Sequence, residues 1–159
     1  MDDRLKKTPK SLSLLFATFL LVLLSGCALP RIIIVKDPLT PEEHLNLGVA
    51  YEKSGEFDNA IKQYKLAAKK RPIAYLYLGN AHFQKNEWAE AEHYYRKAIE
   101  KNPKNADAYN NLAWLYYTKR ENLDHAERLA IQAIDLNPSK ESLYRDTLDK
   151  IRQKRNERQ

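Results

Sequence analysis

The stretch LYLGNAHFQKNEWAEAEHYYRKAIEKNP at residues 76–103 decides the fold of this chain. Small and aromatic residues recur in it at helical spacing, and a proline closes it. Residues three or four positions apart share one face of an α-helix, as Ala91 and Tyr95 do. Pro103 ends that helix, because proline lacks the backbone N–H and clashes with the preceding turn. The stretch therefore predicts two helices, with Gly79 placed where they cross closely.

The same pattern recurs when the chain is shifted against itself by about 34 residues. Each copy has a small residue at the helix crossing, an alanine early in the second helix and a closing proline. These residues are Gly48, Ala60 and Pro72 in the first copy, Gly79, Ala91 and Pro103 in the second, and Ala113, Ala126 and Pro138 in the third. One helix pair cannot bury its apolar face alone, so neighbouring pairs must stack into a solenoid.

This pattern resembles the tetratricopeptide repeat over roughly residues 41–139. The resemblance implies an all-α fold, namely a right-handed α-solenoid of about three helix pairs plus a C-terminal capping helix. We expect the repeats at about 41–71, 72–105 and 106–139. Residues 140–159 are expected to form the capping helix and a basic tail, because a solenoid needs a terminal element with a polar outer face.

The copies differ at two joints. The step from Pro72 to Tyr75 is three residues shorter than the corresponding steps, which leaves the angle between the first two repeats open. In the third repeat the turn between the helices is longer, and Arg120 stands near the place that glycine usually occupies in the family.

Residues 1–26 have the order of an export signal: a charged start, an apolar run over residues 12–24 and small residues before a cysteine. The apolar run is short for a bilayer span, which takes roughly 20 residues. The closing letters LSGC at 24–27 resemble the lipobox of bacterial lipoprotein precursors. The resemblance implies cleavage before Cys27, acylation of Cys27 and a tether over residues 27–40.

Cys27 is the single cysteine of the chain, and lipidation explains a thiol that has no disulfide partner. The alternatives are an uncleaved short membrane anchor and an ordinary secretory signal with a chance cysteine. Ala28 follows the cysteine, whereas an aspartate there favours inner-membrane retention in Gram-negative lipoproteins. In a Gram-negative source the resemblance therefore favours an outer membrane location facing the periplasm.

Patterns typical of catalysis are scarce. No serine lies in a Gly-x-Ser-x-Gly elbow, and the four histidines form no His-Glu-x-x-His pair. His44 and His82 fall on repeat packing positions, so we expect them at the edge of the core and not as metal ligands. A glycine-rich phosphate loop is lacking as well. The sequence therefore predicts no enzyme activity, no cofactor and no metal site.

The first helix of each predicted pair offers a second face. Its positions are Leu45, Val49 and Glu52 in repeat one, Leu76, Asn80 and Phe83 in repeat two, and Asn110, Trp114 and Tyr117 in repeat three. In the family this face lines the groove in which partners bind. Asparagine can donate and accept at once, and aromatic side chains are enriched at interfaces. The predicted partner-binding residues are Asn80, Phe83, Asn110, Trp114 and Tyr117. Packing of Trp114 and Phe83 on neighbouring helices is the alternative.

Two functions stay open. The first is a membrane-anchored scaffold or adaptor that binds a peptide segment of a protein partner in the cell envelope. Its layout is similar to pilot lipoproteins of pili and secretion systems and to lipoprotein adaptors of envelope peptidases. The second is an envelope accessory whose basic C-terminal helix binds anionic lipid or polymer, with the repeats as spacer. The lysine and asparagine pattern that clamps a C-terminal carboxylate in some family members is absent.

The net charge and the predicted export signal argue against a nucleic-acid partner. The net charge is +6, and residues 1–26 contribute +2 of it (four basic minus two acidic side chains), which leaves about +4 for the mature chain. That balance is only mildly basic, and an exported chain does not routinely meet nucleic acid. We expect neither a nucleic-acid partner nor a small-molecule substrate.

Replacing Cys27 by alanine should abolish fatty-acid labelling, because the diacylglyceryl thioether forms on that thiol. Metabolic labelling with a tagged palmitate, followed by gel electrophoresis, measures the incorporation. The variant should also retain its signal segment, since lipoprotein signal peptidase acts on the acylated precursor. Continued uptake of labelled lipid by the variant would rule out Cys27 as the attachment point.

Overall fold

The computed structural model describes residues 37–157. The predicted signal segment, Cys27 and most of the expected tether lie outside the described residues. The described part is helical, and its elements are α2 (Pro41–Lys53), α3 (Phe57–Ala68), α4 (Ala74–Gln84), α5 (Trp88–Lys101), α6 (Ala106–Lys119), α7 (Leu123–Leu136), a short 3₁₀ turn at Pro138–Lys140 and α8 (Glu141–Asn156). Within this part of the chain, no helix has the length and apolar character to cross a membrane.

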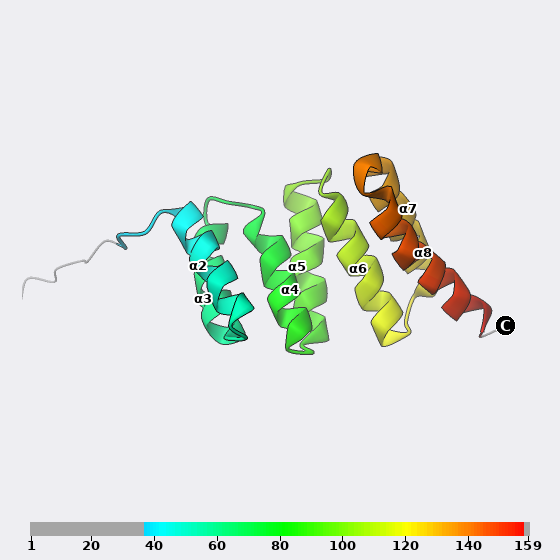
Figure 1. Cartoon of the computed structure of the whole chain (residues 1–159), viewed down its shortest axis with the longest axis horizontal. Helices are drawn as coiled ribbons and strands as arrows, with labels where there is room; N and C mark the ends of the chain where they lie inside the picture. Colours follow the sequence, from blue (N-terminus) through cyan, green and yellow to red (C-terminus); the bar gives the residue numbers. More distant parts are fainter. Residues whose placement is uncertain (1–36, 158–159) are drawn as a thin grey trace, which may run out of the picture. The chain divides into compact units, whose positions relative to one another are not determined.

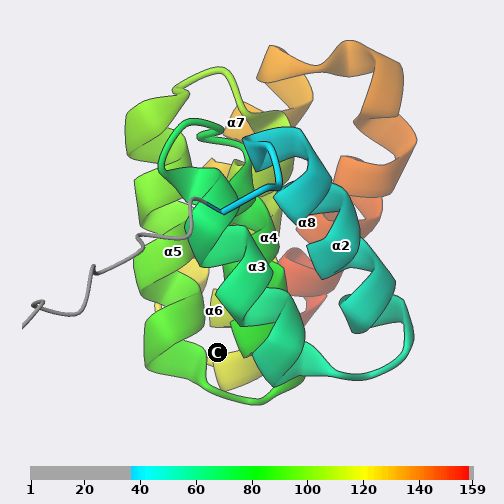
Figure 2. The ribbon, with the colours of Figure 1, turned by 90° about the vertical axis from the view of Figure 1, so that its left-hand side faces the viewer.

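The helices pack as consecutive pairs, α2 with α3, α4 with α5 and α6 with α7, and α8 closes the row against α7 and α6. Figure 1 shows the pairs following one another in chain order. Figure 2 looks along the row from the α2–α3 end, with the later helices behind. The all-α solenoid of helix pairs with a last capping helix, predicted from the sequence, is confirmed.

Local signals define where the helices begin. Thr40 caps α2, since its hydroxyl accepts a hydrogen bond from the Glu43 N–H at 3.2 Å while the Glu43 carboxylate accepts from the Thr40 N–H at 2.7 Å. This reciprocal pair satisfies two backbone donors that a helix start leaves free. At the start of α6, the Asn105 side chain accepts from the Ala108 N–H at 3.2 Å.

All three turns inside the helix pairs use a left-handed backbone at the same repeat position. The residues are Gly55 with φ of 78°, Asn86 with φ of 59° and Arg120 with φ of 57°. Glycine adopts this conformation without steric cost and asparagine tolerates it, whereas arginine does so rarely. The left-handed position is therefore retained in the third repeat although its residue type departs from the family pattern, and the longer third turn adds a second left-handed residue at Asn122.

The three-residue shortening after Pro72 falls at the beginning of α4. This helix has 11 residues, while its counterpart α6 has 14. A tight turn at Pro72 replaces the lost turn of helix, with the Tyr75 N–H donating to the Pro72 carbonyl at 3.0 Å. The deletion thus shortens one helix and keeps the stacking of the pairs.

Two of the helix pairs are held by a tyrosine that fills the space beside a glycine. Tyr64 of α3 lies against Gly48 of α2, and Tyr95 of α5 lies against Gly79 of α4. Both rings are buried, and a Cβ atom added at Gly48 would lie only 2.6 Å from Cδ1 of Tyr64. The interior is close-packed, so such an atom has no room.

In the third pair, smaller residues form the corresponding contact between the two helices. Ala113 of α6 stands at the position of the two glycines, and Ala130 of α7 stands at the position of the two tyrosines. Both alanines are fully buried. The smaller residue on the second helix therefore leaves room for the methyl group on the first.

Replacing Gly79 by alanine should lower the free energy of unfolding by about 1–3 kcal/mol, because the new methyl group overlaps the Tyr95 ring. Denaturant titration of the full chain measures the change. The double variant Gly79→Ala/Tyr95→Ala imitates the third repeat, so it should be more stable than the sum of the single effects predicts. Strictly additive effects would contradict the proposed contact.

The last helix is packed as a structural element. Tyr144, Leu148 and Ile151 of α8 are buried, and the Tyr144 hydroxyl donates to Oδ1 of Asp107 at 2.7 Å. Burial of each side chain of this size stabilises the fold by about 1.5–3 kcal/mol. Leu143 on the same helix is 55% exposed and provides an internal comparison.

A chain that ends at Ser139 should melt at a clearly lower temperature, because the truncation exposes the face of α7 that α8 covers. Leu148→Ala should destabilise the full chain by about 2–5 kcal/mol, the range for leucine truncation in a core. The matched variant Leu143→Ala should change stability by no more than about 0.5 kcal/mol. Thermal unfolding monitored by circular dichroism makes the comparison. An unchanged melting curve for the truncated chain would mean that α8 is an appendage.

Candidate partner-binding groove

Two adjoining hollows lie along the first helices of the pairs. The first hollow, of about 340 Å³, is lined by Val49, Glu52, Lys53, Phe57, Tyr77, Asn80 and Gln84. The second, of about 290 Å³, is lined by Glu52, Asn80, Phe83, Gln84, Tyr95, Asn111 and Trp114. They share Glu52, Asn80 and Gln84, so they form one continuous depression from α2 across α4 to α6, which we call the groove.

Three of the five residues predicted to bind a partner line this groove, namely Asn80, Phe83 and Trp114. Tyr117 lies next to them without lining it, and its ring centroid is 4.9 Å from that of Trp114. Phe83 also packs on Trp88, with the ring centroids 5.1 Å apart. The aromatic residues therefore both face the groove and pack on neighbouring side chains.

Asn110 corrects the expectation from the sequence, because it does not line the groove. Its side chain is only 8% exposed, and among the described residues its Oδ1 has no hydrogen-bond partner. Leu45 and Leu76 hold the equivalent positions in the first two repeats and are also buried. Asn110 thus occupies a packing position of the repeat, and its neighbour Asn111 is the asparagine of α6 that reaches the groove.

A small hydrogen-bond network orients the two asparagines. The hydroxyl of Tyr95 donates to Oδ1 of Asn80 at 3.0 Å, and Nδ2 of Asn111 donates to the same oxygen at 2.9 Å. The Asn80 amide therefore keeps its two N–H groups, and the Asn111 amide keeps its carbonyl oxygen, for a partner. Together the pair offers a donor and an acceptor, the complement of one peptide group.

A carboxylate lies at the centre of the groove. The buried hydroxyl of Tyr64 donates to Oε2 of Glu52 at 2.5 Å. Burial, and then this hydrogen bond, raise the pKa of Tyr64 far above its ordinary range. Burial, and then the charge of Glu52, likewise raise the pKa of Tyr95. Both tyrosines therefore stay protonated and act as donors at physiological pH.

The α8 end of the groove is bounded by a cation over an aromatic ring. Nζ of Lys150 lies 5.3 Å from the ring centroid of Trp114, within the range of cation–π attraction. The same ammonium group pairs with Oδ2 of Asp146 at 2.6 Å. This arrangement holds Trp114 at the edge of α6 beside the last helix.

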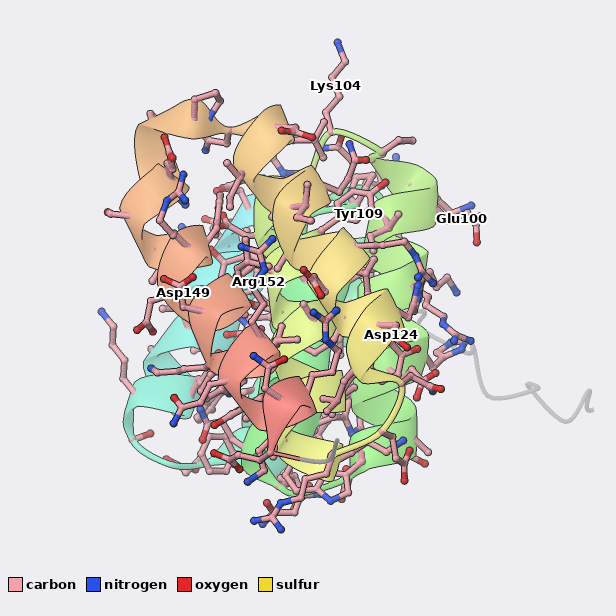
Figure 3. All side chains as sticks on the ribbon, turned by 90° about the vertical axis from the view of Figure 1, so that its right-hand side faces the viewer. Glu100, Lys104, Tyr109, Asp124, Asp149 and Arg152 are labelled. Atoms are coloured by element: carbon pink, nitrogen blue, oxygen red, sulfur yellow. The ribbon has the colours of Figure 1, made fainter. Side chains whose placement is uncertain are left out.

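The basic residues of α8 are largely engaged in ion pairs. Figure 3 shows Arg152 of α8 beside α7. Nε of Arg152 lies 2.8 Å from Oε1 of Glu127 on α7, and Arg155 pairs with the other oxygen of that carboxylate. Lys154 pairs with Glu157 at 2.6 Å. Residues 141–157 carry five basic and four acidic side chains, so this helix is close to neutral. Arg152 and Arg155 join the cap to α7, whereas Arg145, Lys150 and Lys154 pair with acidic residues of the same C-terminal segment, so these cations do not form an open basic surface.

Comparisons with known proteins agree with this architecture. Family models described as tetratricopeptide repeat match residues 41–73, 72–105 and 94–128. A curated human protein, the protein O-mannosyl-transferase TMTC2, is 32% identical over 104 residues. The match covers 60% of this chain and 12% of that protein, so the chain spans about an eighth of its relative.

Solved structures show the same fold at low sequence identity. The first tetratricopeptide-repeat domain of Spaghetti (RPAP3) bound to the HSP90 peptide SRMEEVD has a TM-score of 0.65 and 23% identity, covering 76% of this chain and 96% of that one. The TPR2B domain of yeast Sti1 in a complex with pHsp70 has a TM-score of 0.67 and 23% identity, covering 71% and 96%. The repeat domain of Arabidopsis OM64 has a TM-score of 0.65 and 20% identity, covering 71% and 94%.

Together the three family matches span residues 41–128, which is more than half of the chain, and the helix pairs have the arrangement of the solved domains. This chain belongs to the tetratricopeptide-repeat family.

Proposed function

We propose that this chain is a scaffold whose groove binds an extended peptide segment of a protein partner. The Asn80–Asn111 pair carries the proposal, because the network with Tyr95 leaves the N–H groups of Asn80 and the carbonyl oxygen of Asn111 available to a ligand. Phe83 and Trp114 add aromatic surface beside this pair. Aromatic side chains supply much of the binding energy at protein interfaces.

The likeness to peptide-bound domains supports the same function. The RPAP3 repeat domain is bound to an HSP90 peptide, and the Sti1 domain is in a complex with pHsp70. Binding by a preformed groove requires no catalytic group. The match to the O-mannosyl-transferase concerns 12% of that enzyme, so we propose no transferase activity for this chain.

We also propose that the scaffold is anchored in a bacterial cell envelope by lipid on Cys27. The support is the order of charge, apolar run and LSGC in residues 1–27. Each buried CH₂ group contributes about 0.8 kcal/mol, so two or three acyl chains give stable anchoring where one does not. Residues 28–40 would then act as the tether, and the outer membrane facing the periplasm is the favoured location in a Gram-negative source.

The charges of α8 favour the groove over the alternative of a lipid-binding basic helix. Arg152 and Arg155 share the carboxylate of Glu127, and Lys154 pairs with Glu157. A helix whose cations are already paired attracts anionic polymers weakly, and salt screens what remains. The proposed partner is therefore a protein, captured by the groove in the envelope.

Asn80→Ala and Asn111→Ala should each weaken capture of the partner, because a buried peptide group would lose a hydrogen bond worth about 1–3 kcal/mol. The purified full chain serves as bait for solubilised envelope proteins, and the retained protein is quantified at rising salt. Asn156→Ala, an exposed amide at the end of α8, is the matched control and should bind normally. Melting temperatures of all variants check that the fold is intact.

The opposite pattern would contradict the groove. If both groove variants capture the partner normally while Lys154→Glu abolishes association, α8 carries the binding. If the retained material is lipid alone and elutes at moderate salt, the repeats are a spacer. Trp114→Ala should weaken capture too, but it also removes packing with Tyr117, so it tests the groove less directly.

A further inference from the structure

Among the described residues, Glu52 is the one acidic residue that lines the groove. Glu52 lines both hollows, and in the second hollow it is the one charged residue among the seven lining side chains. Lys53 is its neighbour in sequence, but it is exposed and lines the first hollow alone. The ammonium group of Lys150, beyond Trp114, is already paired with Asp146.

The carboxylate of Glu52 is held in place but not neutralised. Its Oε2 accepts the Tyr64 hydroxyl, and Tyr64 is fully buried, which fixes the position of the side chain. No ion pair to Glu52 is formed by the described residues, although Asp58, Glu87, Glu92 and Glu127 all have such partners. An oriented anion with an open oxygen therefore faces the groove.

The surroundings strengthen the attraction of this anion for a cation. Glu52 is half-buried, and the buried Tyr64 ring lies beside it. Opposite charges near a protein surface attract about four times more strongly, at an effective dielectric constant of 20, than in bulk water. A ligand ammonium or guanidinium group would regain hydrogen bonds there that it loses on leaving water. An acidic ligand would be repelled by Glu52, and Lys53, the one cation among the described residues that line the groove, lies exposed in the first hollow and does not line the second.

We propose that the groove selects a partner segment with a lysine or arginine side chain that meets Glu52 and an adjacent apolar side chain that rests on Phe83 and Trp114. The inference rests on the proposed function, since it assigns the specificity of the same groove. The HSP90 peptide in the RPAP3 complex, SRMEEVD, carries three acidic residues. This chain has a carboxylate at the centre of its groove, so it should prefer segments of the opposite charge.

A positional-scanning library of blocked synthetic heptapeptides tests the selection without knowledge of the partner. The immobilised full chain is incubated with the library, and enrichment of each amino acid at each position is measured. The wild type should enrich lysine and arginine at one position by about tenfold over glutamate, which corresponds to about 1.4 kcal/mol. An apolar residue should be enriched beside that position, and the basic preference should fall with rising salt.

Two substitutions at Glu52 make the test specific. Glu52→Gln keeps an oxygen that can accept from Tyr64 but removes the charge, so it should lose the basic preference while still enriching the apolar position. Glu52→Lys should reverse the preference toward acidic residues. The matched control Glu90→Gln changes an exposed carboxylate on α5, away from the groove, and should behave like the wild type.

The outcomes separate this inference from the function on which it rests. Suppose that the wild type enriches peptides and Asn80→Ala loses this enrichment, but the enriched peptides show no basic preference that depends on Glu52. The groove then binds peptides, and the proposed selectivity is wrong. A basic preference that persists in Glu52→Gln also overturns the role of Glu52. If the wild type enriches no peptide, or if Asn80→Ala and Asn111→Ala leave enrichment unchanged, both proposals fail.

Discussion

The close approach of the two helices within each pair is the constraint on which the rest of the structure depends. In the first two pairs it requires glycine on one helix because a buried tyrosine ring occupies the space on the other. In the third pair Ala113 and Ala130 reach the same result with two small side chains. Since each pair also stacks on the next, the buried core continues from one pair to its neighbour along the row.

The same tyrosines connect the packing of the pairs to the groove. Each ring is locked against a glycine, and its hydroxyl reaches the far side of the first helix. There Tyr64 donates to Glu52, and Tyr95 donates to Asn80. The two polar groups that we assign to partner binding are therefore oriented by core residues and not by mobile surface contacts. A preorganised groove of this kind binds with a smaller loss of side-chain entropy.

The last helix, α8, has two roles: it bounds one end of the groove, and it covers the apolar face of α7. Its apolar side covers α7, and its cations are joined to acidic residues of α7 and of the helix itself. Lys150 extends this role to the groove, because it lies over the ring of Trp114. A segment that is basic in sequence thus serves packing and end-capping, and the polar and aromatic residues of the groove remain the best candidates for recognition.

The sequence by itself determined the fold class, the order of the helix pairs and the capping helix, because these follow from signals repeated over many residues. It also indicated Asn80 and Phe83 of α4 and Trp114 of α6 as residues of the corresponding face of two repeat helices. Only the tertiary structure decided that Asn111 and not Asn110 lines the groove, and that the cations of α8 are paired. Adjacent residues on a helix differ in direction by about 100°, and the rotation of α6 is set by its contacts with α5, α7 and α8. Ion pairs between α7 and α8 likewise depend on which side chains the packing brings together, which no periodicity in the sequence records.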